Sequence, residues 1–164
     1  AAVRTRVADY ADLTKPKIAT MALVTVAAGY LLGADPANLR PDLLLHTLVG
    51  AGVVAAGGSA LNHWLERKAD AHMHRTLNRP LPSGRLLPGE AFAFGFALAV
   101  GGVVYLLAAL PTPAAAVAAL ATAFLYVAVY TPMKRVTSWN TVVGAIPGAL
   151  PPVIGWAAAR GDVG

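Results

Sequence analysis

Apolar residues fall into five long blocks along the chain, separated by short segments rich in charge, proline or glycine. Each block is close to the ~17–25 residues that a helix needs to cross the hydrocarbon core of a bilayer. The blocks cover residues 18–33, 43–65, 91–110, 114–130 and 142–159. This pattern predicts an all-α fold, a polytopic transmembrane helical bundle of about five helices.

The composition supports a membrane protein. Hydrophobic residues make up 57% of the 164 and charged residues only 13%, whereas a soluble domain carries about 25% charged residues. Cysteine is absent, which excludes disulfides, thiolate metal sites and cysteine nucleophiles. The first block ends in Tyr30-Leu31-Leu32-Gly33, without a convincing small-residue cleavage site. We therefore expect a retained helix rather than a cleaved signal peptide.

The net charge of +5 is distributed unevenly. Of the 13 lysines and arginines, 11 lie before the first block, between the second and third, or between the fourth and fifth. The other two are Arg40 and Arg160. This is the positive-inside distribution, which places the N-terminus and all three basic segments on the cytoplasmic side of the cell membrane. The charge therefore follows membrane topology, and we expect no nucleic-acid partner.

One polar stretch begins at the end of the second block and carries most of the candidate chemistry. Asn62, Glu66 and Asp70 are spaced by four residues, so on a helix their oxygens form a stripe on one face. Mg²⁺ prefers hard oxygen ligands and commonly binds through one or two carboxylates together with substrate phosphates. Arg75 and Arg79 follow closely and suit an anionic, phosphate-rich ligand. The stripe is a candidate metal and catalytic site.

The alternative interpretation of this stretch is structural. In it, Asn62 is only a capping residue, and the two acids lie on the surface, paired with nearby cations. Those cations would be Arg67, Lys68 and Arg75. The run Arg75-Thr76 followed by Arg79-Pro80-Leu81 favours the functional interpretation, because the whole string is much less common by chance than an isolated acid pair.

Other polar residues near the stripe leave two interpretations open. Lys134 and Arg135 end the fourth block on the basic side, where they either mark topology or bind phosphate. His63, His72 and His74 could bind a metal, a haem or a carboxylate, but their spacing does not give a closed zinc site.

Glycine and proline predict how the blocks pack. Closely spaced glycines let helix backbones approach each other in lipid, so we interpret them as packing positions. Pro147, Pro151 and Pro152 predict a break or kink in the fifth block. Broken helices at membrane depth often line a cavity, so this block is a candidate wall of a substrate chamber.

Several strings resemble the protohaem IX farnesyltransferase (haem O synthase) family of the UbiA-type intramembrane prenyltransferase superfamily. They occupy residues 9–10, 13–18, 62–85, 130–140 and 148–156, so the match is spread over nearly the whole chain. The most specific parts are Met73-x-Arg75-Thr76-x-x-Arg79-Pro80-Leu81 and Pro151-Pro152 with Gly155-Trp156.

The resemblance implies transfer of a farnesyl group from farnesyl diphosphate to a vinyl group of haem B, giving haem O and pyrophosphate. Asn62, Glu66 and Asp70 would be the first acidic motif, which binds Mg²⁺ and the diphosphate; the family often has aspartate at the position of Glu66. Further contacts to the diphosphate or a haem propionate would come from Arg75, Arg79, Lys134 and Arg135. The implied partners are both substrates, the lipid bilayer and haem A synthase.

The family fold implied by the resemblance has nine helices and a second aspartate motif. Residues 1–164 would be the N-terminal part of that single domain, with about five helices and the first motif, and we expect this part alone to be inactive. Two other functions remain open. One is a prenyltransferase of quinone synthesis that uses the same stripe with a different acceptor, and the other is a non-catalytic membrane transporter or assembly subunit.

Overall fold

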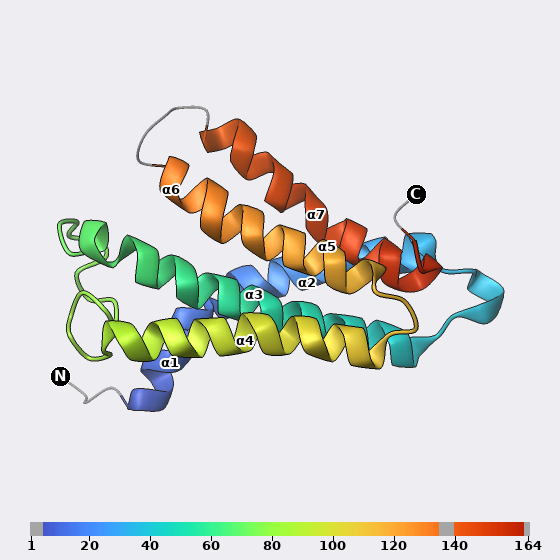
Figure 1. Cartoon of the computed structure of the whole chain (residues 1–164), viewed down its shortest axis with the longest axis horizontal. Helices are drawn as coiled ribbons and strands as arrows, with labels where there is room; N and C mark the ends of the chain where they lie inside the picture. The colour runs from blue at the N-terminus through green and yellow to red at the C-terminus, as the bar shows by residue number, and fades with distance from the viewer. Residues whose placement is uncertain (1–4, 135–139, 163–164) are drawn as a thin grey trace.

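The computed structural model describes residues 5–134 and 140–162, which form helices joined by turns (Figure 1). No strand occurs in this part of the chain. The elements in order are α1 (Arg6–Thr14), α2 (Pro16–Gly33), the 3₁₀ turn η1 (Pro36–Asn38), α3 (Pro41–Asp70), α4 (Pro88–Ala109), α5 (Ala114–Phe124), the π-helical η2 (Leu125–Tyr130), α6 (Thr131–Met133) and α7 (Asn140–Arg160).

Five helices are long and apolar enough to cross a membrane, as the hydrophobic blocks predicted. They are α2, α3, α4, the continuous run from α5 to α6, and α7. The second is 30 residues long and continues past the apolar block to Asp70. Thus the whole candidate stripe is helical.

The termini of these helices sort to two ends of the bundle (Figure 1). Helix α1, the turn between α3 and α4, and α6 lie at one end, and η1 lies at the other with the end of α7. The basic segments in the described residues therefore gather at one end, whereas Arg40 and Arg160 lie at the other. This arrangement agrees with the charge pattern.

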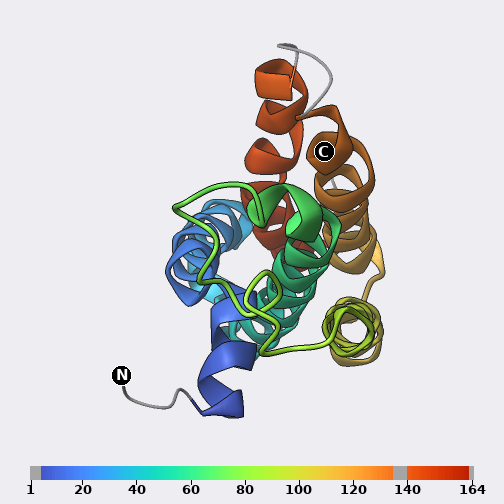
Figure 2. The ribbon, with the colours of Figure 1, turned by 90° about the vertical axis from the view of Figure 1, so that its left-hand side faces the viewer.

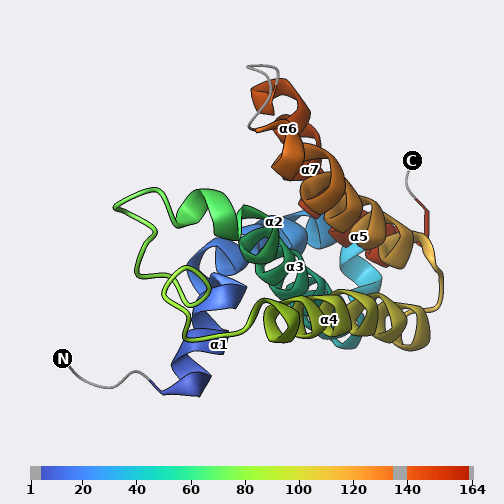
Figure 3. The same cartoon turned by 60° about the vertical axis from the view of Figure 1, so that its left-hand side comes forward.

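Helix α3 lies at the centre of the bundle and packs antiparallel to α4, while α7 packs along α2 and α5 (Figure 2). The pair formed by α5 and α7 diverges from α4 toward α6 (Figures 1 and 3). The larger core cluster includes Val54 of α3, Leu106 of α4 and Ile154 of α7, together with the alanine-rich face of α5. His46, which lies near the end opposite α1, bonds to the Tyr105 hydroxyl through Nδ1 at 2.7 Å.

Glycine allows the closest contact between α2 and α7. A Cβ atom added at Gly29 would overlap the backbone carbonyl of Pro152, and one added at Gly155 would overlap the carbonyl oxygen of Val26. Backbone atoms cannot move aside as flexible side chains can. The packing role predicted for Gly29 is therefore confirmed, and Gly155 makes a contact of the same kind, whereas a Cβ at Gly148, also predicted to pack, would meet no atom within 4 Å.

The prolines predicted a break or a kink in the last block; the break is wrong, and the kink stays a prediction. Helix α7 is assigned continuously from Asn140 to Arg160, with Pro147, Pro151 and Pro152 inside it. Each proline lacks one backbone donor, but α7 packs against α2 and α5, and these contacts hold it as one element.

Helix α1 is an element that the hydrophobic pattern did not predict. It has only nine residues, begins with Thr5 as its N-cap, and buries Asp9 and Leu13. Tyr10 adds an edge-on aromatic contact to Phe94 of α4, with ring centroids 4.9 Å apart. One short helix with two buried positions is too weak a periodic pattern to read from the sequence.

We expect Gly29→Ala to destabilise the bundle by roughly 2 kcal/mol or more, because the methyl group meets backbone of α7. Gly101→Ala is the matched control, since its Cβ would meet no atom within 4 Å. That change should be neutral or stabilising by up to about 1 kcal/mol, because alanine is the better helix former. Thermal unfolding in detergent measures both. Equal effects of the two changes would contradict the proposed close contact.

Candidate active site

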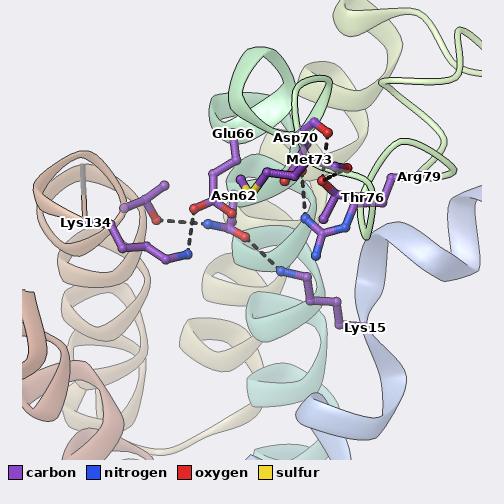
Figure 4. Close-up of polar contacts among 9 residues, drawn as sticks. Lys15, Asn62, Glu66, Asp70, Met73, Thr76, Arg79 and Lys134 are labelled. Atoms are coloured by element: carbon purple, nitrogen blue, oxygen red, sulfur yellow. Dashed lines mark hydrogen bonds and ion pairs between the residues drawn. The ribbon is translucent and has the colours of Figure 1, made fainter.

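The candidate stripe consists of three oxygen-bearing side chains at the α1 end of α3. Asn62 is 1% exposed and Asp70 is 3% exposed, while the Glu66 side chain is 13% exposed. Each of the three bonds to a cation from a different element (Figure 4). The cations close around one helical edge, so the charge of the two carboxylates is balanced locally.

Lys15 contacts the first member of the stripe. Its Nζ donates to Asn62 Oδ1 at 2.8 Å. The residue joins α1 to α2 in the left-handed conformation, with φ 47° and ψ 61°, which is uncommon for a residue other than glycine. Burial, with the nearby Arg79 charge, lowers the pKa of Lys15 to about 8.

Lys134 contacts the second member. Its Nζ lies 2.6 Å from Glu66 Oε1, and it also sits 5.6 Å from the centre of the Tyr130 ring. The Lys134 side chain is 38% exposed and the Glu66 side chain 13%, so the cation is the more solvent-accessible member of the pair.

Arg79 contacts the third member. Its Nη1 lies 2.7 Å from Asp70 Oδ2, on a turn that folds back over the end of α3. Thr76 fastens that turn by donating its hydroxyl to the Asp70 carbonyl oxygen at 2.7 Å. Arg85 ties the turn to α1 through Asp9 Oδ1 at 2.8 Å.

The surface-pair interpretation of the acids is wrong, because their partners are Lys134 and Arg79. Arg67 instead stacks over the Trp64 ring and donates to the Trp64 carbonyl oxygen at 2.6 Å. Arg75, also predicted to bind substrate, is exposed and makes no hydrogen bond or ion pair to the stripe within the described residues. Arg135 lies outside the described residues.

The three nearby histidines divide into one buried and two exposed side chains. His72 and His74 are exposed, and His72 Nδ1 lies 2.8 Å from the Lys68 carbonyl oxygen. His63 is 4% exposed, and neither of its ring nitrogens has a hydrogen-bond partner among residues 5–134 and 140–162. None of these contacts marks a histidine as a metal ligand.

A cavity of about 520 Å³ adjoins the site and extends between α2, α3, α5, η2 and α7. Its lining is mostly apolar, but it includes Lys15, Ser59 and the tyrosines Tyr126 and Tyr130. Pro147, with neighbours on α7, forms part of the wall, as expected for a proline-rich segment. Lys15 belongs both to the cavity and to the charged cluster, so the two are contiguous.

The oxygen donors of the stripe fit Mg²⁺ bound together with phosphate, rather than a closed protein cage. In the described part of the chain, no group of three or more His, Asp or Glu side chains gathers to hold an ion. Mg²⁺ usually keeps several waters and takes only one or two carboxylates. Each ion pair here uses one oxygen of its carboxylate, Glu66 Oε1 or Asp70 Oδ2. The donor set is therefore suitable for a metal–phosphate complex.

A family model described as the UbiA prenyltransferase family matches residues 22–164. The chain belongs to this family. Alignments with curated proteins agree with this assignment. The chain is 49% identical to a protoheme IX farnesyltransferase of Solibacter usitatus, and the alignment covers 94% of this chain and 56% of the relative's length. It is 43% identical to the protein of that name from Opitutus terrae, covering 94% of this chain and 52% of the relative.

A third protoheme IX farnesyltransferase, from Salinibacter ruber, is 46% identical over 95% of this chain and 54% of its own length. The chain thus spans about half the length of the curated UbiA-family relatives that it matches. No solved structure matches the chain significantly.

Two residues that bond to Asn62 were not predicted as site residues, Lys15 and Thr131. The charge pattern identified Lys15 only as one of the cations that mark topology. The sequence feature that could have identified it is the Lys15-Pro16 pair, since proline often begins a helix. Thr131 accepts a hydrogen bond from Asn62 Nδ2 at 3.1 Å and is 2% exposed. A threonine before a proline at a helix end carries no chemistry by itself, so only the fold identifies it.

We expect Asp9→Asn to loosen the turn between α3 and α4 by about 2 kcal/mol, because Arg85 loses the charge of its buried partner. Hydrogen exchange of the amides between residues 71 and 87 measures this opening. Arg6→Gln is the matched control: its ion pair with Glu90 is exposed, so the exchange of the same amides should stay unchanged. Unchanged exchange in Asp9→Asn would refute the role assigned to that pair.

Proposed function

We propose that this chain forms part of a Mg²⁺-dependent membrane prenyltransferase that transfers a farnesyl group from farnesyl diphosphate to a vinyl group of haem B, giving haem O and pyrophosphate. The three relatives described above carry the name protoheme IX farnesyltransferase. The observation that carries the proposal is the oxygen stripe of α3, bonded to three cations, at the edge of an apolar cavity.

Asn62, Glu66 and Asp70 would hold Mg²⁺ through hard oxygen atoms. The metal supplies Lewis-acid stabilisation of the negative charge that develops on the departing diphosphate. Lys134 and Arg79 are more exposed than the carboxylates that they contact, with side-chain exposures of 38% and 26% against 13% and 4%. They are therefore placed to meet an anionic ligand arriving from solvent and to stabilise the leaving group.

The reaction requires the allylic C–O bond of farnesyl diphosphate to break and a C–C bond to the haem vinyl group to form. Water then adds to the other vinyl carbon and releases a proton, which balances the product as a hydroxyethylfarnesyl group. No side chain serves as a covalent nucleophile. The apolar cavity would hold the prenyl chain and exclude water from the allylic cation until the acceptor attacks.

The proposal also includes location and partners. We place the segment in the cytoplasmic membrane, with α1 and the stripe on the cytoplasmic side, because the basic segments share that end of the bundle. Haem A synthase is the proposed partner that consumes haem O. Arg75 and Arg135 stay candidate contacts to the diphosphate or a haem propionate. The carboxylates of the stripe all come from one helix, α3. We therefore propose that residues 1–164 alone do not catalyse the reaction.

The test uses the gene that carries this segment, expressed with its complete reading frame in a bacterial strain that lacks haem O synthase. We expect haem O, identified by its mass and pyridine haemochrome spectrum, to depend on Mg²⁺. Asp70→Asn should lower the rate at least about 100-fold, because it removes a carboxylate from the metal and phosphate site.

Asp42→Asn is the matched control, since Asp42 also pairs with an arginine but lies exposed at the other end of the bundle. It should stay within about twofold of the unchanged protein. A prenylated quinone precursor in place of haem O would indicate the quinone enzyme. No product and no farnesyl diphosphate binding would indicate a non-catalytic membrane protein, and either result would reject the proposal.

A further inference from the structure

The fourth span changes its helical geometry where it reaches the stripe. The α-helix ends at Phe124, residues Leu125–Tyr130 form a π-helical turn, and α-helix resumes at Thr131. Pro132 explains the change, because it has no N–H to donate to the carbonyl four residues earlier and its ring crowds that group. π-turns inside α-helices occur frequently at functional sites.

Thr131 closes this turn twice. Its backbone N–H and its hydroxyl both donate to the carbonyl oxygen of Tyr126, the hydroxyl at 2.7 Å. A carbonyl oxygen can only accept, so the single hydroxyl hydrogen of Thr131 is committed to Tyr126. The same hydroxyl oxygen therefore acts only as an acceptor toward α3.

This acceptor decides how the Asn62 amide is oriented. Its NH₂ group must face Thr131, where Nδ2 lies 3.1 Å from Oγ1, and its carbonyl oxygen must face away from Thr131. Lys15 Nζ, which can only donate, meets that oxygen at 2.8 Å. Both neighbours require the same orientation, and both Asn62 and Thr131 are almost fully buried.

The π-turn also sets where Lys134 lies. An added residue in a turn rotates everything after it by about 100° relative to an uninterrupted α-helix. Thr131 and Lys134 are three residues apart and share a face of the resumed helix. That face meets Asn62 and Glu66, which are four residues apart on α3. The two pairs form adjacent contacts between the fourth span and α3.

We infer that Thr131, with the π-turn that it closes, is a positioning residue that directs the Asn62 carbonyl oxygen toward the metal and phosphate site and holds Lys134 against Glu66. The inference rests on the proposed function, because it takes Asn62 as a ligand of that site. Thr131 itself touches no reacting atom; it acts through Asn62.

The test measures Mn²⁺ binding by electron paramagnetic resonance on the detergent-purified, full-length protein. Thr131→Val keeps the shape of the side chain and removes the hydroxyl, so we expect the Mn²⁺ dissociation constant to rise about tenfold. Thr131→Ser keeps the hydroxyl and should restore binding to within about twofold. We expect kcat to be lower in Thr131→Val than in Thr131→Ser. The KM for the haem acceptor should be unchanged in both variants.

Thr47→Val is the matched control. Thr47 is fully buried on α3 and also donates its hydroxyl to a backbone carbonyl, that of Leu43 at 2.6 Å, but it lies away from the stripe. It should leave Mn²⁺ binding unchanged. If Thr131→Val does not fold, Thr131→Cys replaces it, because the thiol is a weak donor of similar size, and binding should again weaken.

Asn62→Ala separates the two proposals. Weaker Mn²⁺ binding in Asn62→Ala together with unchanged binding in Thr131→Val would overturn only the positioning role, as would a Thr131→Ser variant as weak as Thr131→Val. Unchanged binding in Asn62→Ala would overturn the ligand role of Asn62 within the proposed function, and the positioning role with it.

Discussion

The balance between two carboxylates, one buried and one partly buried, and the cations around them is the interaction on which this site depends. Glu66 and Asp70 lie where an apolar helix ends, and an unpaired charge there would be costly. Their partners are Lys134, which follows α6, and Arg79, which lies on the turn after α3, while Lys15 reaches Asn62 from the junction of α1 and α2. The contacts that balance the charge of the stripe are therefore the same contacts that hold these three segments against α3.

The same arrangement suits a site that exchanges one anion for another. Lys134 and Arg79 stand outside the carboxylates, toward solvent, and a lysine or arginine binds phosphate oxygens through the same donors that it offers a carboxylate. In the proposed function, a diphosphate with its metal would take over those donors without leaving a charge unpaired. Charge balance can thus be maintained both with and without ligand.

Close packing and open space are combined on one helix. At Gly155, α7 approaches the backbone of α2 too closely for any side chain, whereas Pro147 and Pro151 on α7 line the cavity. Proline gives a rigid wall whose missing donor is tolerated beside a cavity in the membrane. The contact with α2 fixes the position of that wall, which explains why three prolines coexist with a continuous helix.

The sequence by itself determined the all-α membrane class, the five spans, the stripe on α3 and the gathering of basic segments at one end, because length, hydropathy and helical period are local properties. Only the tertiary structure decided that Glu66 pairs with Lys134 and Asp70 with Arg79, since these partners are distant along the chain or lie in an irregular turn. It also brought Lys15 and Thr131 to Asn62. Which donor faces which acceptor depends on how helices pack against one another, and no periodic pattern within a single helix records that.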